Sequence, residues 1–146
     1  MLPVRIRRLD PSLPLPEYQT PGAAGFDLAA SGDVEVPPGQ IALVPTGLVI
    51  EVPAGHVLGI FARSSTPLKR GLMVANGVGL IDQDYCGATD EIKVQVLNFT
   101  PAAVQIRKGD RIAQGVFLPV ALAEWREASG DLRDGSRGGF GATGER

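Results

Sequence analysis

Residues 76–87, Asn-Gly-Val-Gly-Leu-Ile-Asp-Gln-Asp-Tyr-Cys-Gly, carry the most informative side chains of the sequence. Glycines at 77, 79 and 87 predict a tight hairpin whose backbone can approach a ligand. Asn76 offers a donor and an acceptor to a planar base edge. If the segment is extended, Asp82 and Asp84 lie on one face, and Tyr85 can stack on a sugar or base. A polar hairpin with a core tyrosine would look similar, but an apolar run leading into two acids and a tyrosine favours a functional site.

A second segment, residues 61–67, suits an anion. Arg63 supplies a bidentate fork for phosphate oxygens, and the hydroxyls of Ser64 and Ser65 follow it directly. A short helix beginning near Thr66 or Pro67 would add to the attraction through its N-terminus. The alternative, weighed about equally, is that one of the two serines only caps that helix.

Two further polar residues give weaker signals. Asp27 follows a turn of small residues, where an aspartate is more often a local cap than a catalyst. Gln114 follows the turn Gly109-Asp110-Arg111 inside a predicted strand, where it either faces a ligand or is a satisfied polar group of the sheet.

The C-terminal residues 137–144 contain a literal Gly-x-Gly-x-x-Gly from Gly139 to Gly144. No strand precedes it and no βαβ unit can follow, so a dinucleotide-binding fingerprint is excluded. The remaining chemistry suits a lid, in which Phe140 stacks on a base and Arg137 meets a phosphate. Composition alone favours a disordered tail.

Short alternating segments predict the framework that positions these residues. Half-buried strands are expected at 4–7, 34–36 and 92–96, with further strand candidates at 57–61, 104–107 and 112–120 and with 41–52 as two strands or one bent strand. Helix signals are thin: 67–71 predicts one turn, and 121–128 has helix formers without a clear cap. Short strands separated by turns indicate a single all-β sandwich, jelly roll or barrel.

Composition limits the classes of function. With 146 residues and 44% hydrophobic residues, the chain supports one packed domain. A formal charge of −2 argues against a general nucleic-acid or anionic-membrane binder. The single cysteine and single histidine cannot form a Cys/His zinc site. No signal peptide is evident, and we expect a reducing cytoplasm.

Taken in their order along the chain, the five segments resemble the five motifs of the dUTP diphosphatase (dUTPase) family over about Pro21 to Gly144. The resemblance implies a jelly-roll-like distorted β-barrel, a homotrimer with C-terminal arm exchange, cytoplasmic location and Mg²⁺ as the working ion. It implies a β-barrel domain over 1–128 and a Gly-rich arm over 129–146 that closes an active site. The activity implied is hydrolysis of dUTP to dUMP and pyrophosphate.

The resemblance also implies roles for individual residues. Asp82 corresponds to the aspartate that activates the attacking water, and Tyr85 to the ring that packs under the deoxyribose. Asp27 corresponds to an acid linked to the metal through water. The other residues implied in substrate binding are Arg63, Ser64, Ser65, Asn76, Gly79, Leu80, Ile81, Gln114, Arg137, Phe140, Gly141 and Thr143.

Two other functions stay open on the sequence alone. A dCTP deaminase, or a bifunctional deaminase–diphosphatase, would share the fold but place a glutamate within the strand after residues 76–87, where only Glu91 occurs, at its start. A non-catalytic β trimer would share the strands without needing Asp82 and the Gly-rich arm together.

Overall fold

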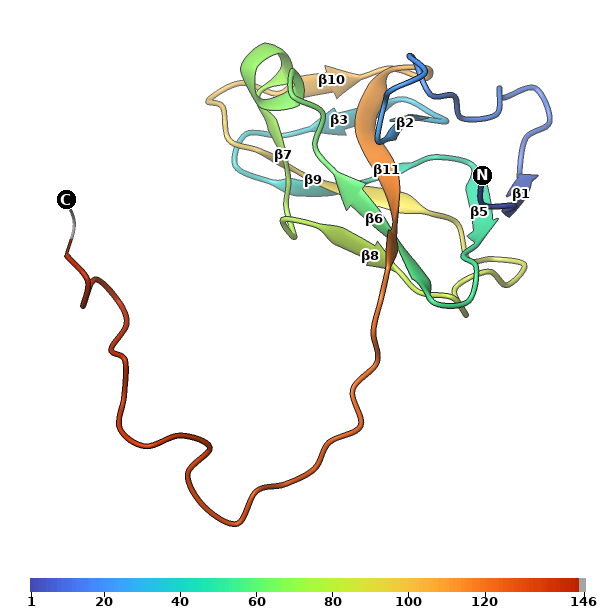
Figure 1. Ribbon diagram of the computed structural model, residues 1–146. Helices are drawn as coiled ribbons and strands as arrows, with labels where there is room; N and C mark the ends of the chain where they lie inside the picture. The colour runs from blue at the N-terminus through green and yellow to red at the C-terminus, as the bar shows by residue number, and fades with distance from the viewer. Residues whose placement is uncertain (145–146) are drawn as a thin grey trace.

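The computed structural model describes residues 1–144 and is almost entirely β-structure (Figure 1). Its strands and its single helical turn, in chain order, are β1 (Arg5–Arg8), β2 (Phe26–Ala29), β3 (Val34–Val36), β4 (Ile41–Pro45), β5 (Leu48–Glu51), β6 (His56–Phe61), η1 (Thr66–Arg70), β7 (Leu72–Val74), β8 (Gly79–Ile81), β9 (Lys93–Asn98), β10 (Val104–Ile106) and β11 (Arg111–Pro119). The all-β prediction is therefore confirmed. No helix within residues 1–144 is long and apolar enough to cross a bilayer.

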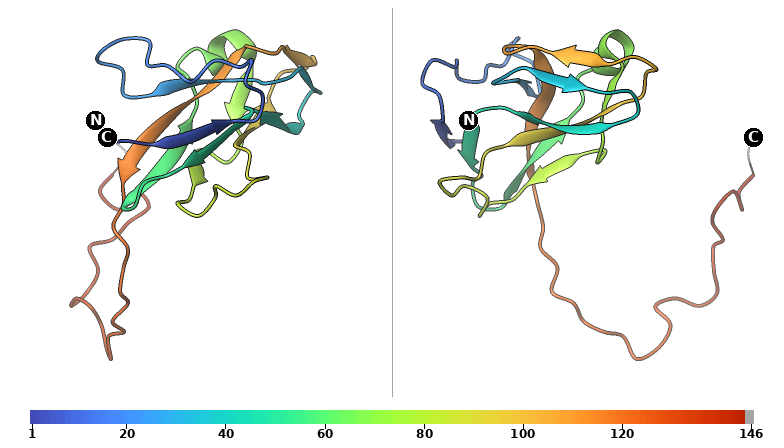
Figure 2. Two further views of the ribbon diagram at one scale, coloured as in Figure 1. Left: turned by 90° about the vertical axis from the view of Figure 1, so that its right-hand side faces the viewer. Right: turned by 180° about the vertical axis from the view of Figure 1, so that it is seen from behind.

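The strands form four antiparallel sheets, and across the described residues these do not close into a barrel. The orders are β2-β11-β6-β8, β4-β9-β7, β1-β5 and β10-β3. Strand β11 crosses in front of β9, so the four-stranded sheet covers the three-stranded one (Figures 1 and 2).

Alternating side chains build the core between the sheets. In β9, Val94 and Val96 are fully buried, whereas Lys93 faces solvent. Leu28 of β2 and Leu58 of β6 join the same apolar cluster from the opposite sheet. Period-two alternation is typical of sheets with one buried face, and it correctly predicted β9.

The prediction of a hairpin around Gly77 is wrong. Strand β7 pairs with β9, and β8 pairs with β6, so residues 75–78 connect two different sheets. Gly77 does adopt the left-handed conformation that a tight turn favours, with φ of 74°. The turn was therefore predicted correctly, but a local sequence cannot say which distant strand each arm will pair with.

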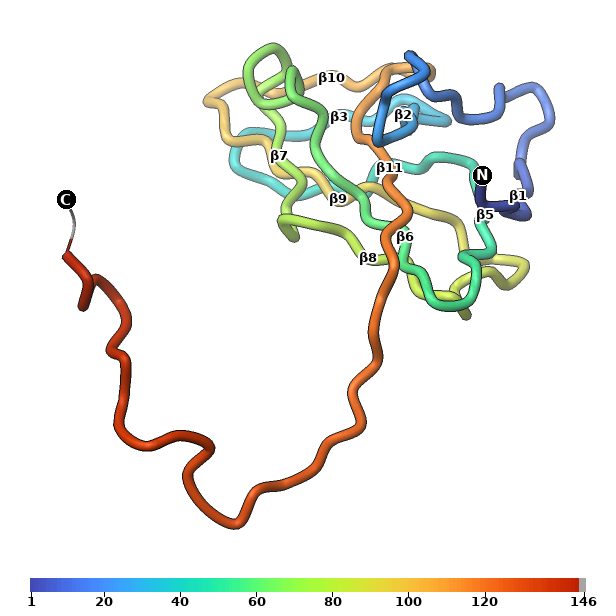
Figure 3. Tube along the Cα trace, in the orientation of Figure 1, coloured from blue at the N-terminus to red at the C-terminus, as the bar shows by residue number. Residues whose placement is uncertain are grey.

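The chain after β11 leaves the packed body as an extended segment, which the tube trace follows from Pro119 outwards (Figure 3). Residues 121–128 form no helix, although they contain helix formers. Leu122 and Trp125 are about nine-tenths exposed, so these apolar side chains have no cover within the described part of their own chain. Strand β11 ends at Pro119, the Val120 N–H still donates to the Gly55 carbonyl at 2.9 Å, and residues 145–146 of the predicted arm lie outside the described residues.

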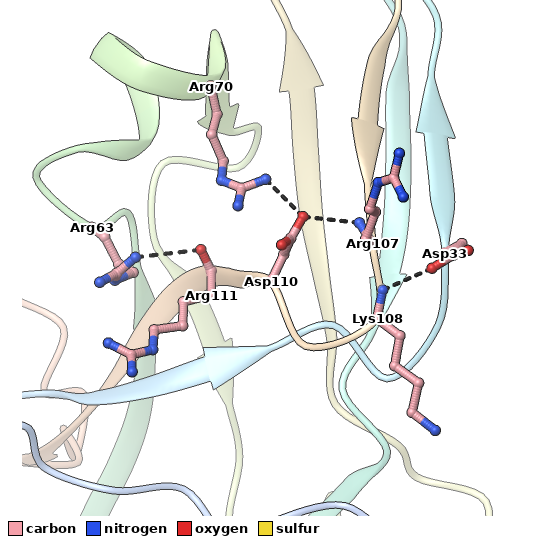
Figure 4. Close-up of polar contacts among 7 residues, drawn as sticks. All are labelled: Asp33, Arg63, Arg70, Arg107, Lys108, Asp110 and Arg111. Atoms are coloured by element: carbon pink, nitrogen blue, oxygen red, sulfur yellow. Dashed lines mark hydrogen bonds and ion pairs between the residues drawn. The ribbon is translucent and has the colours of Figure 1, made fainter.

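Asp110 ties η1 to the turn between β10 and β11 (Figure 4). Its Oδ2 accepts hydrogen bonds from Arg70 Nη1 and from the Arg107 backbone N–H, both at 2.9 Å. The Arg70 hydrogen bond, with that of Arg107, lowers the pKa of Asp110 from its ordinary 3.8. The ionised carboxylate therefore stabilises the fold above the unfolded pKa, and this contribution is lost as the pH falls through the lowered folded pKa.

We therefore expect Asp110→Asn to lower the free energy of unfolding at pH 7 by about 1 kcal/mol, because Asn keeps the acceptor but removes the charge. The difference from the parent protein should shrink as the pH falls from the ordinary 3.8 through the lowered pKa of folded Asp110, because the folded parent carboxylate becomes neutral only below that pKa. Urea unfolding at pH 7 and pH 3 measures both values. A difference that is unchanged between the two pH values would contradict this origin.

Candidate active site

A cluster of charged and polar side chains spans three neighbouring strands of the four-stranded sheet. The strand register places Asp27 of β2 opposite Gln114 of β11, and Gln114 opposite Phe61 of β6. Arg63 follows β6 by two residues, and its Nε lies 2.9 Å from Asp27 Oδ1. Arg111 Nη1 lies 3.3 Å from Asp27 Oδ2. Asp27, Arg63, Arg111 and Gln114 are called the cationic cluster below.

A hydrogen bond of the Gln114 amide holds this side chain in the cluster, and Gly25 leaves the space that the amide occupies. Its Nε2 donates to the Ala62 carbonyl at 3.0 Å, next to Arg63. A Cβ on Gly25 would lie only 2.7 Å from Gln114 Oε1, so glycine leaves room for the amide. The Gln114 side chain is therefore partly satisfied within the sheet, while its position beside Arg63 is fixed.

The two serines after Arg63 lead into η1. Ser65 occupies the position that precedes the helical turn, but its side chain makes no capping hydrogen bond. Ser64 is exposed. The helix-cap alternative for Ser65 is therefore not supported, and the Ser64 hydroxyl faces solvent beside the cationic cluster.

Asn76, Gly79, Leu80 and Ile81 lie on or beside β8, at the edge of the same sheet. Asn76 is exposed in the turn before β8, and Leu80 is also exposed. Gly79 is buried against β6, where a Cβ would lie 3.1 Å from the Ile60 Cβ. Strand β8 is therefore an edge strand, with a polar side chain beside it, Asn76, and an apolar one on it, Leu80, exposed to solvent.

Residues 82–91, called the carboxylate loop below, follow β8. They do not continue as an extended strand as expected, because the Tyr85 N–H donates to the Asp82 carbonyl at 3.2 Å and closes a turn. Asp82 and Asp84 are both exposed, but not as alternate residues of one strand face. The local turn between them overrides the extended geometry that was assumed.

Hydrogen bonds within the carboxylate loop, and one between the loop and the β4–β5 turn, fix its shape. The Tyr85 hydroxyl donates to the Glu91 carbonyl at 3.1 Å, and Gly87 N–H donates to Asp90 Oδ2 at 2.7 Å. Glu91 Oε1 accepts from the Gly47 N–H at 2.8 Å. The Glu91 carboxylate is therefore used to fasten the loop to the β4–β5 turn.

The cationic cluster and the carboxylate loop lie at opposite ends of β6 in one chain. Ile81 of β8 pairs with Leu58 of β6, and the two strands are antiparallel. Arg63 comes five residues after Leu58, and Asp82 comes one residue after Ile81. Because the strands are antiparallel, these two steps run in opposite directions. At a rise of ~3.3 Å per residue, Asp82 and Arg63 are about 20 Å apart along the strand.

The extended segment after β11 runs away from both groups (Figures 1 and 2), and it contains the predicted site residues Arg137, Phe140, Gly141 and Thr143. All four are exposed, and the backbone hydrogen bonds in this region are local, such as Ala142 N–H to the Gly139 carbonyl. One copy of residues 1–144 thus does not assemble the predicted site residues in one place.

The carboxylates and other possible ligands in the described residues indicate how a divalent metal ion could be held. Within residues 1–144, no three His, Cys, Asp or Glu side chains gather as a metal site. Asp27 Oδ2 is buried and accepts no hydrogen bond from the described residues, since Arg111 approaches it without hydrogen-bond geometry. This oxygen can accept a hydrogen bond from a metal-bound water. The residues present therefore fit a Mg²⁺ ion that keeps its waters and takes phosphate ligands.

Sequence comparison identifies relatives across nearly the whole chain. The sequence model of the dUTPase family matches residues 12–144. A deoxyuridine 5'-triphosphate nucleotidohydrolase of Desulfitobacterium hafniense is 51% identical over 142 residues, covering 94% of this chain and 91% of the relative. One of the same name from Thermobifida fusca is 47% identical over 144 residues, covering 97% of this chain and 78% of the relative.

Solved structures share the fold. The dUTPase from Streptococcus mutans has a TM-score of 0.76 and 38% identity, covering 84% of this chain and 98% of that one. A dUTPase mutant of Staphylococcus bacteriophage 80alpha, solved with dUpNHpp, has a TM-score of 0.86 over 99% of both chains. At 22% identity this second likeness concerns the fold alone.

Proposed function

The chain belongs to the dUTPase family, and from this membership we propose that it hydrolyses dUTP to dUMP and pyrophosphate. The observation that carries the proposal is the family match over residues 12–144, which includes every predicted site residue from Asp27 to Thr143. Such an enzyme limits uracil in DNA and supplies dUMP for dTMP synthesis, and we place it in the cytoplasm.

In the proposed reaction a water molecule attacks the α-phosphorus of dUTP. Asp82 accepts a proton from that water as its oxygen bonds to phosphorus, and the bond from the α-phosphorus to the bridging oxygen breaks to release pyrophosphate. The exposed position of Asp82 in a loop fastened at Glu91 supports this role. No covalent enzyme intermediate is needed.

The binding roles follow the chemistry of each group. Arg63, Ser64, Ser65 and Gln114 bind phosphate oxygens. Tyr85 packs under the deoxyribose, and its hydrogen bond to the Glu91 carbonyl holds the ring in place for that contact. Asn76 and the backbone through Leu80 and Ile81 read the edge of uracil.

Bound Mg²⁺ would supply charge neutralisation on the triphosphate oxygens and on the leaving pyrophosphate. Asp27 would meet its water shell through the buried Oδ2 that accepts no other hydrogen bond among the described residues. A phage phi11 dUTPase of the same fold has been described with a structural Mg(II) ion.

We further propose that the active unit is a homotrimer with exchanged C-terminal arms. The carboxylate loop and the cationic cluster are about 20 Å apart in one chain, too far for one triphosphate to bridge with Asp82 at the α-phosphate. A second copy can bring its carboxylate loop to the cationic cluster of the first. The arm of a third, with Arg137, Phe140, Gly141 and Thr143, can then close the site.

The structure offers surfaces that such an assembly would cover. Ile41, Leu97 and Met73 lie side by side across β4, β9 and β7, and the first and last are about half exposed. Burying an apolar sheet face and the exposed Leu122 and Trp125 would stabilise a permanent assembly.

Deamination has less support as an alternative. Glu91 is the one glutamate near the expected position, and its carboxylate already accepts the Gly47 N–H at 2.8 Å. Incubation with each dNTP and Mg²⁺, with measurement of pyrophosphate, monophosphate and ammonia, tests the proposal. We expect dUMP and pyrophosphate from dUTP and no ammonia from dCTP. Absence of pyrophosphate from dUTP would favour a non-catalytic trimer.

The same assay tests sugar selection. Because Tyr85 leaves no room for a 2′-hydroxyl in the proposed pose, kcat/KM for UTP should be about 10²-fold below that for dUTP. Equal efficiency on the two nucleotides would contradict the role of Tyr85 while leaving the hydrolysis itself intact.

A further inference from the structure

A β-bulge in β11 brings Arg111 into the cationic cluster. Arg111 pairs with Ala29 and Gln114 with Asp27, so three residue steps on β11 match two on β2. On a regular strand, side chains three residues apart point to opposite faces. Because of the extra residue, Arg111 lies on the same face of the sheet as Asp27 and Gln114. Without the bulge, strand alternation would place it on the opposite face. Ile112 and Ala113, both fully buried, mark the interruption.

The bulge creates a pair of arginines that share one carboxylate. Asp27, whose side chain is 15% exposed, meets Arg63 Nε through one oxygen and Arg111 Nη1 through the other. Arg63 Nη1 also approaches the Arg111 carbonyl at 3.5 Å. Among the described residues neither arginine has another carboxylate within ion-pair distance, so two positive charges face one negative charge.

This arrangement leaves guanidinium groups open to an anion. Arg63 uses its Nε on Asp27, and the Arg111 side chain is about half exposed. Figure 4 shows the guanidinium groups of Arg63 and Arg111 on one side of the Asp110 turn, with the side-chain ends of Arg107 and Lys108 on the other. Arg111 was missed in the sequence because the turn and strand alternation give no sign of the bulge.

We propose that Arg111 is a second triphosphate-binding arginine of this site, held beside Arg63 by Asp27. The inference rests on the proposed function and adds one substrate contact to it. The triphosphate is the occupant that the chemistry favours, because it carries several negative charges and oxygens spaced for guanidinium forks. The remaining positive charge of the cluster is then neutralised by substrate.

Binding of a non-hydrolysable imido analogue of dUTP tests this contact directly, by calorimetry in the presence of Mg²⁺. We expect Arg111→Ala to weaken binding of the analogue by about 10- to 100-fold, as for loss of a charge-assisted hydrogen bond. Arg111→Lys, which keeps the charge but loses the fork, should bind with intermediate affinity. Inhibition by deoxyuridine, which has no phosphate, should change less than about twofold in both variants.

Arg107→Ala is the matched control, since it removes the same charge from the same turn while its side chain lies outside the cluster. It should change binding of the analogue less than about twofold, because exposed charges are screened by salt. Unchanged binding in Arg111→Ala, or equal losses for the analogue and deoxyuridine, would overturn the inference. If the parent protein neither binds the analogue nor hydrolyses dUTP, the proposed function fails, and this inference with it.

Discussion

Replacing Asp82 with asparagine is expected to lower kcat for dUTP by about 10²- to 10⁴-fold, the usual contribution of a general base. Asparagine has nearly the same shape and still accepts one hydrogen bond, but it cannot take a proton from water. The turn closed by Tyr85 N–H on the Asp82 carbonyl uses the backbone and should survive. Binding of the imido analogue should therefore change far less than turnover.

Asp84→Asn provides the matched control for that variant. Asp84 lies two residues further along the same exposed loop, so its replacement removes the same charge at nearly the same place. Pre-steady-state measurement of dUMP formation, together with calorimetric binding, separates chemistry from affinity. Near-normal turnover in Asp82→Asn, or an equal loss in Asp84→Asn, would remove Asp82 from the proposed mechanism.

Ending the chain after Asp134 is expected to reduce kcat/KM for dUTP by about 10³-fold while the body stays folded. The loss combines a charge-assisted hydrogen bond from Arg137, a contact from Thr143 and stacking by Phe140. Folding should persist because the last strand, β11, ends at Pro119 and the bonds of residues 138–144 are local. Kinetics, circular dichroism and light scattering of the truncated protein measure activity, fold and assembly.

Single substitutions separate the contributions of individual arm residues to kcat/KM. Arg137→Ala should lose more activity than Arg133→Ala, since both are exposed arginines of the extended segment but only Arg137 stands directly before Gly138 and Gly139. Phe140→Ala isolates the aromatic ring, which is fully exposed in the free chain. A truncated protein with full activity would instead identify the arm as a disordered tail.

The sequence predicted the all-β class and most strands, because alternation follows directly from burial of one sheet face. It left residues 41–52 open as two strands or one bent strand, and the structure separates β4 from β5 at Thr46 and Gly47, where Gly47 has a φ of 68°. It did not predict β2, whose four residues follow a turn of small residues and give little periodicity. Nor did it predict that β7 and β8 join different sheets, since pairing depends on distant strands.

The sequence named candidate site residues but not how they are arranged in space. Arg63, Gln114 and Asp27 come together as neighbours on one sheet, which their separation in sequence could not indicate. Asp82 and Asp84 were assigned to one strand face, and a backbone turn places them otherwise. Arg111 was overlooked because its orientation depends on a single extra residue in β11.

The opposite placement of Asp82 and Arg63 along β6 also predicts how defective copies would behave when mixed. If each pocket takes Asp82 from one subunit and Arg63 from another, a copy that lacks only Asp82 and a copy that lacks only Arg63 can each supply what the other has lost. Mixed assemblies of these two inactive proteins would then regain part of the activity, whereas an isolated monomer would be inert however well it folded.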